Sequence, residues 1–222
     1  QIPPGTGLGS SSSVAVTMIK ALAFWCGLDL GPAEGAELAC YIEINKMNMP
    51  IGKQDQYAAA FGGLNCIQFS RDGVVVEPLR SSTETRQGLE KGLMLFFTGS
   101  SRQSSTILRQ QEKASREGEE KTVARLDAIK SLGIDIRNAL EAGDLNAFGE
   151  LLHQSWMNKR ELTPGITNPF LDECYQAALD NGAVGGKVTG AGGGGFMMLY
   201  CPQEQQEAVT EALTTLGLQR RS

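Results

Sequence analysis

A glycine-rich turn stands directly in front of a helical pattern at the start of the sequence, which reads QIPPGTGLGSSSSVAVTMIKAL. Apolar residues recur at roughly helical spacing over 14–26, and the serines at 10–13 are expected to cap that helix. Exposed backbone N–H groups in such a turn favour an anion, because the unpaired amides and the helix dipole both attract negative charge. The first ligand to consider is therefore a phosphate.

The turn does not match the two best-known phosphate motifs. No Gly-Lys-Ser/Thr follows it, which excludes the nucleoside-triphosphatase P-loop, and Ser10 stands where the Rossmann motif needs a third glycine. A later stretch, GAGGGG, matches that motif at Gly190, Gly192 and Gly195, but FMMLYC follows it and is strand-like, whereas dinucleotide binding needs a helix there. Taken alone, GAGGGG indicates close backbone packing as readily as a ligand.

Composition excludes several partners. The 222 residues are 41% hydrophobic, and the formal net charge is -5 with dispersed basic residues, so no nucleic acid and no membrane surface is expected. Five cysteines without CxxC spacing mostly have apolar neighbours, which is typical of reduced thiols in a cytoplasmic protein. No apolar run reaches the roughly 20 residues of a membrane span, and the first residues are not a signal peptide.

The rest of the sequence predicts an α+β fold. Helices are expected over 32–47, within GKQDQYAAAFGG, over 104–152 with breaks near Gly133 and Gly143, and over 170–181 and 204–216. Strands are expected in a hairpin around Arg71-Asp72-Gly73, in GLMLFFTGSS, and on both sides of the GAGGGG loop. The boundary between two lobes is expected near 83–92.

Three stretches carry a specific resemblance. PPGTGLGSSSS, GKQDQYAAAFGG and KVTGAGGGGF, in that order, resemble the second motif, the catalytic-aspartate segment and the third motif of the GHMP small-molecule kinases. Within that superfamily, GKQDQYAAAFGGLN and LLHQSWMNKRELTPGITNP most resemble bacterial D-glycero-D-manno-heptose 7-phosphate kinases and the related fucokinase domains. The resemblance implies a two-lobe GHMP kinase-like fold, with a truncated N-terminal lobe of ribosomal protein S5 domain 2-like type over 1–85 and a ferredoxin-like C-terminal lobe over 86–222.

Against that family pattern the sequence is expected to be incomplete. The pattern places a first motif and several strands ahead of the opening turn, and one more strand after LGLQRRS. We therefore expect a fragment or a processed product, which could form a homodimer or associate with the missing N-terminal segment.

The implied activity is ATP- and Mg²⁺-dependent phosphorylation of the anomeric hydroxyl of a sugar phosphate. D-glycero-D-manno-heptose 7-phosphate would become the 1,7-bisphosphate, feeding nucleotide-activated heptose for a bacterial lipopolysaccharide or surface polysaccharide. The alternatives are a kinase for another sugar such as L-fucose, and a non-catalytic nucleotide-binding fragment.

The resemblance assigns roles residue by residue. Asp55 would accept or orient the proton of the attacking hydroxyl. Ser11, with Ser10 as its competitor, and Glu43 would hold Mg²⁺. The residues expected to bind the nucleotide are Pro4, Gly5, Thr6, Gly7, Leu8, Gly9, Ser10, Ser11, Gly190, Gly192 and Gly193. Those expected to contact the substrate are Lys53, Gln54, Arg102, His153, Lys159, Arg160 and Thr189.

Each role has a purely structural alternative. Glu43 could be an ordinary solvent-facing carboxylate, and Lys53 a solvated charge. His153, the one histidine, could be a hydrogen-bonded packing residue near Trp156 rather than a sugar contact. Gln54 and Gln56 could be local turn stabilisers, and the 189–195 loop could pack against the first turn without touching a ligand.

Overall fold

The structure is a computed structural model that describes residues 6–99 and 104–221. Those residues form two compact units, one of 9–79 and the other of 6–8 together with 80–99 and 104–221. The division passes between Leu8 and Gly9, so the glycine-rich turn contributes residues to both units. The assignment of 1–85 and 86–222 to two kinase lobes stays a prediction.

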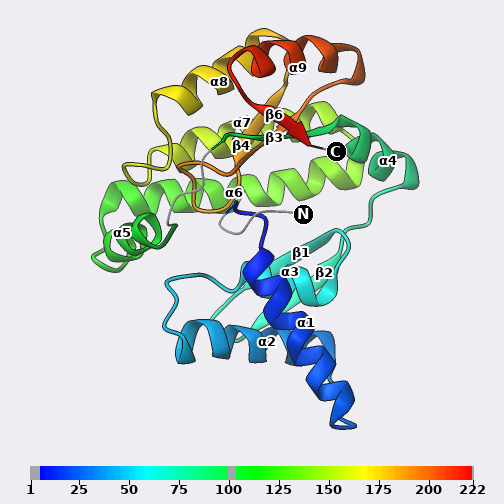
Figure 1. Ribbon diagram of the computed structural model, residues 1–222, viewed down its shortest axis with the longest axis vertical. Coiled ribbons are helices and arrows are strands. Elements are labelled where there is room, and N and C mark those ends of the chain that lie inside the picture. Colours follow the sequence, from blue (N-terminus) through cyan, green and yellow to red (C-terminus); the bar gives the residue numbers. More distant parts are fainter. Residues whose placement is uncertain (1–5, 100–103, 222) are drawn as a thin grey trace. The chain divides into compact units, whose positions relative to one another are not determined.

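The first unit consists of short helices and one hairpin, coloured blue to cyan in Figure 1. Its helical elements are α1 Ser10–Trp25, α2 Pro32–Cys40, the π-helical segment η1 Tyr41–Lys46 and α3 Gln54–Phe61. Its strands are β1 Asn65–Phe69 and β2 Val74–Pro78, which pair antiparallel. The predicted hairpin is confirmed, with the Ser70 N–H donating to the Gly73 carbonyl at 2.9 Å across the turn.

Small side chains allow the helices of this unit to approach closely. Ala36 and Ala39 of α2 and Ala60 of α3 are buried together with Val16 and Ile19 of α1. The distance between packed helices depends on the side chains at their contact, and alanine keeps it short. The first turns of α1 and α3 and the η1 segment are thereby held in one small core.

The second unit contains most of the helices and the larger sheet. Its helices are α4 Thr83–Gly92, α5 Ser104–Arg116, α6 Glu120–Ala142, α7 Leu145–Arg160, α8 Pro169–Asp180, the 3₁₀ turn η2 Gln203–Gln205 and α9 Gln206–Thr215. Its strands are β3 Leu93–Phe97, β4 Gly185–Val188, β5 Phe196–Tyr200 and β6 Gln219–Arg221. Within the described chain these strands form an antiparallel sheet in the order β4-β5-β3-β6.

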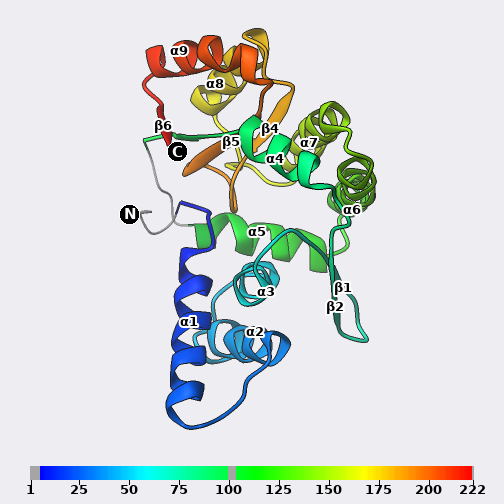
Figure 2. The same cartoon turned by 90° about the vertical axis from the view of Figure 1, so that its right-hand side faces the viewer.

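Helices cover both faces of this sheet, as Figures 1 and 2 show. On one face, Phe96 and Met197 pack with Val209 of α9 in the main core, and none of the three is exposed to solvent. On the other face, the ring of Tyr200 meets Phe148 of α7 edge to face at 5.7 Å. The predicted α+β class is confirmed.

Two local predictions were wrong. The helix over 120–142 continues through Gly133, because its many strong helix formers outweigh the roughly 1 kcal/mol that one glycine costs. The interruption lies instead at 117–119, ahead of α6, while the predicted break at Gly143 is confirmed. The serines at 10–13 do not cap α1, since the helix begins at Ser10 and its N-cap is Gly9.

Along 6–99 and 104–221, no helix combines the length and the apolar character that crossing a bilayer requires. Cys40, Cys174 and Cys201 are buried, as expected for thiols in apolar surroundings, and burial raises the pKa of each to about 11.

Candidate active site

The N-terminus of α1 offers unpaired amides. Gly9 precedes the helix with φ 67°, and in the described structure no side chain caps the first turn. That turn also contains no acidic residue. The amides of residues 10–12 have no partner within the helix, so this end is suited to an anion.

Glu43 lies beneath that helix end as a buried carboxylate. Ser11 Oγ donates to its Oε1 at 2.6 Å, and Ser12 Oγ donates to its Oε2 at 2.9 Å. Gln56 Nε2 donates to the same Oε2 at 2.7 Å. Glu43 is only 2% exposed, so the solvent-facing alternative for this residue was wrong. The hydroxyls expected to cap α1 bind this carboxylate instead.

The position of Glu43 depends on a local irregularity. The helix expected over 32–47 is regular only to Cys40 and continues as η1, the π-helical segment that contains Glu43. An extra residue in a helical turn rotates the following side chains relative to a regular helix, and such turns are common at functional sites. Here it accompanies an inward-facing carboxylate.

Asp55 lies in the first turn of α3, close to the same cluster. A Cβ placed on Gly9 would be 3.4 Å from the Asp55 Cγ, so the end of the glycine-rich turn directly adjoins this side chain. Partial desolvation and, secondarily, the Glu43 carboxylate raise the pKa of Asp55 above its ordinary value. A carboxylate with raised pKa beside an anion-binding turn can accept a proton more readily than an ordinary aspartate.

Hydroxyl and carboxylate oxygens are the donors that Mg²⁺ prefers, so Ser11 and Glu43 fit a magnesium site chemically. In the described part of the chain no group of three or more His, Cys, Asp or Glu side chains is arranged to hold a metal. Magnesium would therefore take only part of its coordination shell from these two residues, as is usual where substrate phosphates and water complete it.

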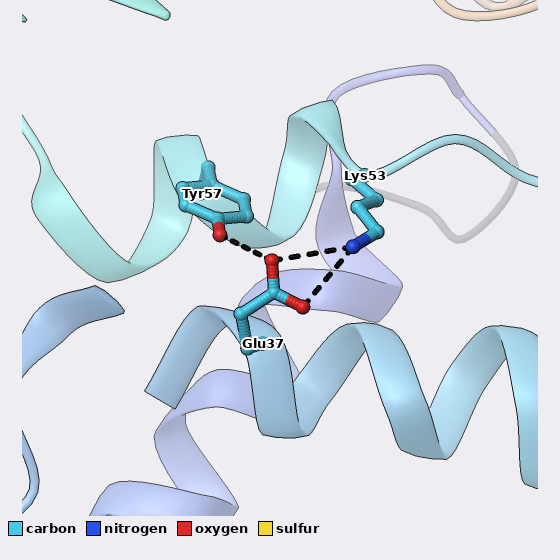
Figure 3. A network of polar contacts seen from close by, with 3 residues as sticks. All are labelled: Glu37, Lys53 and Tyr57. Carbon is cyan, nitrogen blue, oxygen red and sulfur yellow. Dashed lines mark hydrogen bonds and ion pairs between the residues drawn. The ribbon is translucent and has the colours of Figure 1, made fainter. Parts of the chain in front are cut away.

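Lys53 is engaged by a different carboxylate, shown in Figure 3. Its Nζ lies 3.1 and 3.2 Å from the two carboxylate oxygens of Glu37, which also accepts a 2.5 Å hydrogen bond from the Tyr57 hydroxyl. The Tyr57 hydrogen bond, more than Lys53, lowers the pKa of Glu37. This network ties the start of α3 to α2. Gln54, the first residue of α3, is exposed.

In the second unit, the opening turn packs against the later glycine loop. Thr189 Oγ1 donates to the carbonyl of buried Thr6 at 3.0 Å. A Cβ on Gly7, where φ is 76°, would lie 2.7 Å from the Thr189 carbonyl carbon, and a Cβ on Gly190 would lie 2.6 Å from the Gly7 Cα. Only glycine permits this approach of the two backbones.

The remaining loop glycines make further packing contacts. Gly193 N–H donates to the Ile166 carbonyl at 2.8 Å, and a Cβ on Gly192 would be 2.6 Å from the same oxygen. The Gly195 carbonyl accepts from the Thr98 N–H at 2.9 Å. These contacts support the loop-packing alternative. Ligand binding by Gly190, Gly192 and Gly193 stays a prediction.

Three predicted substrate residues lie on α7. His153 Nδ1 is 2.9 Å from the Tyr175 hydroxyl, and the two rings stack. Lys159 donates to the Gly190 carbonyl. Arg160 forms an ion pair with Asp172 of α8 at 2.7 Å. Leu8 and Ser10 are partly buried, and Pro4, Gly5 and Arg102 lie outside the described residues.

Sequence reasoning missed Ser12 and Lys187. Ser12 was counted only as a helix cap, although its hydroxyl binds Glu43. Lys187 stands inside the KVTGAGGGGF stretch, where only Thr189 and the glycines were weighed. The period of two along a strand could have separated Lys187 from its buried neighbours Gly186 and Val188.

The fold and these motifs define a family of small-molecule kinases. The model of the GHMP kinases N-terminal domain matches residues 1–63, and the model of the GHMP kinases C-terminal region matches residues 136–217. The chain belongs to the GHMP kinases.

Individual proteins similar to this chain include two heptose kinases and a fucokinase. The D-glycero-alpha-D-manno-heptose 7-phosphate kinase of Campylobacter jejuni is 38% identical over 213 residues, which are 96% of this chain and 62% of that protein. A crystal structure of a D-glycero-D-manno-heptose 1-phosphate kinase from Bacteroides thetaiotaomicron is 32% identical, with a TM-score of 0.74, and the match covers 99% of this chain and 60% of that one. The L-fucokinase/L-fucose-1-P guanylyltransferase of Bacteroides fragilis is 27% identical over 92% of this chain and 22% of that protein. The chain thus spans about three fifths of the length of the two heptose kinase relatives.

Proposed function

We propose that this chain is part of an ATP- and Mg²⁺-dependent sugar kinase that phosphorylates the anomeric hydroxyl of D-glycero-D-manno-heptose 7-phosphate to give the 1,7-bisphosphate. The observation that supports it most is the cluster in the first unit. Asp55 adjoins Gly9 at the uncapped end of α1, and Ser11 and Glu43 lie hydrogen-bonded beside it.

The residues can divide the chemistry of phosphoryl transfer between them. Amides at the start of α1 bind and orient the nucleotide phosphates, which is most of what this reaction demands of a protein. Asp55 accepts the proton of the anomeric hydroxyl. The hydroxyl oxygen bonds to the γ-phosphorus of ATP while the bond between that phosphorus and the β-phosphate oxygen breaks. When bound, Mg²⁺ neutralises charge on the phosphates. Ser11 and Glu43 would hold it.

The choice of substrate follows from the relatives. Both heptose kinases are more similar in sequence to this chain than the fucokinase is. Their names place the phosphate at different positions, 7 in one and 1 in the other. Activity should therefore be compared on the heptose 7-phosphate, the unphosphorylated heptose and L-fucose. A requirement for the 7-phosphate supports the proposal, and equal use of L-fucose contradicts the substrate.

The first test is calorimetric titration of the chain with MgATP, with and without heptose 7-phosphate, beside a coupled assay of ADP release. Asp55→Asn is expected to reduce turnover by about 10²- to 10⁴-fold, because it removes the proton acceptor. Its affinity for MgATP should stay within a factor of about three, since nucleotide binding depends on amides and the metal site. Near-normal turnover of Asp55→Asn would exclude Asp55 as the acceptor.

The second candidate is a nucleotide-binding piece that is active only in association with another polypeptide. It is favoured by the exposed face of α1, where Met18 and Leu22 are 59% and 62% exposed and Trp25 is 87% exposed. Mass measurement in solution tests it. A smaller polypeptide that co-purifies, or a homodimer, supports association, whereas an active monomer contradicts it.

We place the reaction in the cytoplasm, where ATP and reduced thiols occur together.

A further inference from the structure

Two lysines of the second unit lie near one another on the α7 side of the sheet. A Cβ on Gly185 would be 3.0 Å from the His153 Cβ, so this side of β4 faces α7. Side chains alternate along a strand, so Lys187 shares that face with Gly185, while Val188 faces the core.

Lys159 approaches from α7. Its ammonium donates to the carbonyl of Gly190, three residues beyond Lys187 in the chain. Both lysines are only partly exposed. Desolvation and, secondarily, repulsion by Lys187 lower the pKa of Lys159 to about 7, and desolvation lowers the pKa of Lys187.

Neither ammonium is neutralised by a carboxylate in the described parts of the chain. Lys187 makes no hydrogen bond or ion pair with any described residue, and Lys159 has only the Gly190 carbonyl. The neighbouring cation on α7, Arg160, is balanced by Asp172 at 2.7 Å. Two half-buried like charges without a counter-charge are unfavourable unless an anion joins them.

We propose that Lys159 and Lys187 form a binding site for a phosphate monoester dianion, the phosphate group that the acceptor sugar already carries. This inference rests on the proposed function for the identity of the sugar. The ammonium groups of two lysines can neutralise both charges of such a group.

The nucleotide is the other source of phosphate, but its needs are met elsewhere in the chain. The uncapped amides of α1 and the oxygens of Ser11 and Glu43 suit a metal-bound polyphosphate. None of these groups is a cation that could bind a second phosphate, whereas the lysine pair supplies two cations.

The test uses Lys187→Met and Lys159→Met, because methionine keeps an unbranched chain and removes the charge. Lys130→Met, an exposed lysine of the same unit, is the control. Affinities for heptose 7-phosphate, unphosphorylated heptose and MgATP are measured by calorimetry. In parallel, titration with inorganic phosphate is followed through the lysine ¹³Cε NMR signals.

The wild-type chain should prefer the 7-phosphate over the free heptose, and each variant should lose about 10- to 100-fold in affinity for the phosphorylated sugar alone. MgATP affinity should stay within about twofold, and Lys130→Met should match the wild type. A variant that keeps the preference, or that loses MgATP affinity instead, overturns the proposal. Shifts of the Lys159 and Lys187 NMR signals on addition of phosphate would support the site even if the chain shows no kinase activity. If the chain is active and these signals do not shift, the proposal is overturned.

Discussion

Glu43 joins two helices, because its two oxygens accept from Ser11 and Ser12 of α1 and from Gln56 of α3. Glu43→Gln keeps the shape but turns one oxygen into an N–H donor facing other donors. We expect the free energy of unfolding to fall by about 1–3 kcal/mol, the cost of unsatisfied buried polar groups. The affinity for MgATP should fall while the affinity for metal-free ATP is little changed. Urea unfolding and calorimetry measure the two effects.

Glu37→Gln is the matched control for this substitution. Glu37 is also a carboxylate of the first unit that accepts from a lysine and a tyrosine, but it is half exposed. Glu37→Gln should lower the free energy of unfolding less than Glu43→Gln does, and it should leave the metal dependence of ATP binding unchanged. Equal metal dependence in Glu43→Gln and the wild type would contradict the metal role of Glu43.

Lys159 should give the protein a characteristic dependence of stability on pH. Its pKa is about 7 in the folded chain and roughly 10.4 in an unfolded one. Between these values the unfolded state binds more protons, so the free energy of unfolding rises with pH. Lys159→Met should therefore be more stable than the wild type below pH 7, with a gain that shrinks toward pH 10.

Urea unfolding at pH 6.5 and pH 9.5 checks this prediction, with Lys130→Met to show the effect of losing an exposed charge. A stability difference between Lys159→Met and the wild type that is the same at both pH values would show that Lys159 titrates normally.

At the scale of elements, the contact between the two glycine loops of the second unit is the most constrained feature. Gly7→Ala would place a methyl group 2.7 Å from the Thr189 carbonyl carbon, at a φ of 76°. Gly27→Ala would meet the same backbone strain at φ 68°, but has nothing within 4 Å. Gly27→Ala should cost about 1 kcal/mol or slightly more, and Gly7→Ala clearly more than that.

Thermal unfolding and MgATP titration of the two variants separate strain from contact. We expect the affinity of Gly7→Ala for MgATP to fall at least tenfold, because the glycine-rich turn can no longer pack against the 189–195 loop. If Gly7→Ala and Gly27→Ala behave alike, the packing of the loops has no bearing on binding.

The sequence predicted the local elements well where a short motif determines them. The hairpin at Arg71-Asp72-Gly73 and the helix end at Gly143 follow from turn residues alone. Gly133 did not break α6, because summed helix propensity and tertiary packing outweighed one unfavourable residue. The capping prediction for residues 10–13 failed because the helix begins at Ser10, so that Gly9 is the N-cap, and the Ser11 and Ser12 hydroxyls donate to Glu43, some thirty residues away.

The candidate site shows the same limit. Motifs indicated Ser11, Glu43 and Asp55, but the burial of Glu43 depends on the π-helical segment η1 and on packing among three helices. Neither leaves a clear pattern in one sequence. Lys187 could have been noticed from strand alternation, whereas its approach to Lys159 requires the fold.

At the scale of the whole molecule, α1 carries an exposed apolar face that does not contribute to the core of its own unit. Val14, Met18 and Leu22 recur every four residues, with Trp25 one turn further on, and all four are more than half exposed. An exposed apolar stripe of this length on a helix is typical of an interaction surface. We expect it to mediate association with a second copy or with another segment of the protein.

Met18→Lys combined with Leu22→Lys should abolish that association without unfolding the chain, because both side chains are already largely in solvent. Sedimentation velocity over a range of protein concentrations measures it, and Ile134→Lys, which changes an equally exposed but separate residue of α6, is the control. A wild-type chain that stays monomeric at high concentration and gains no mass from a co-purified segment would contradict the role of this face. If the variant with both Met18→Lys and Leu22→Lys loses kinase activity together with the association, the exposed face of α1 is needed for the active form.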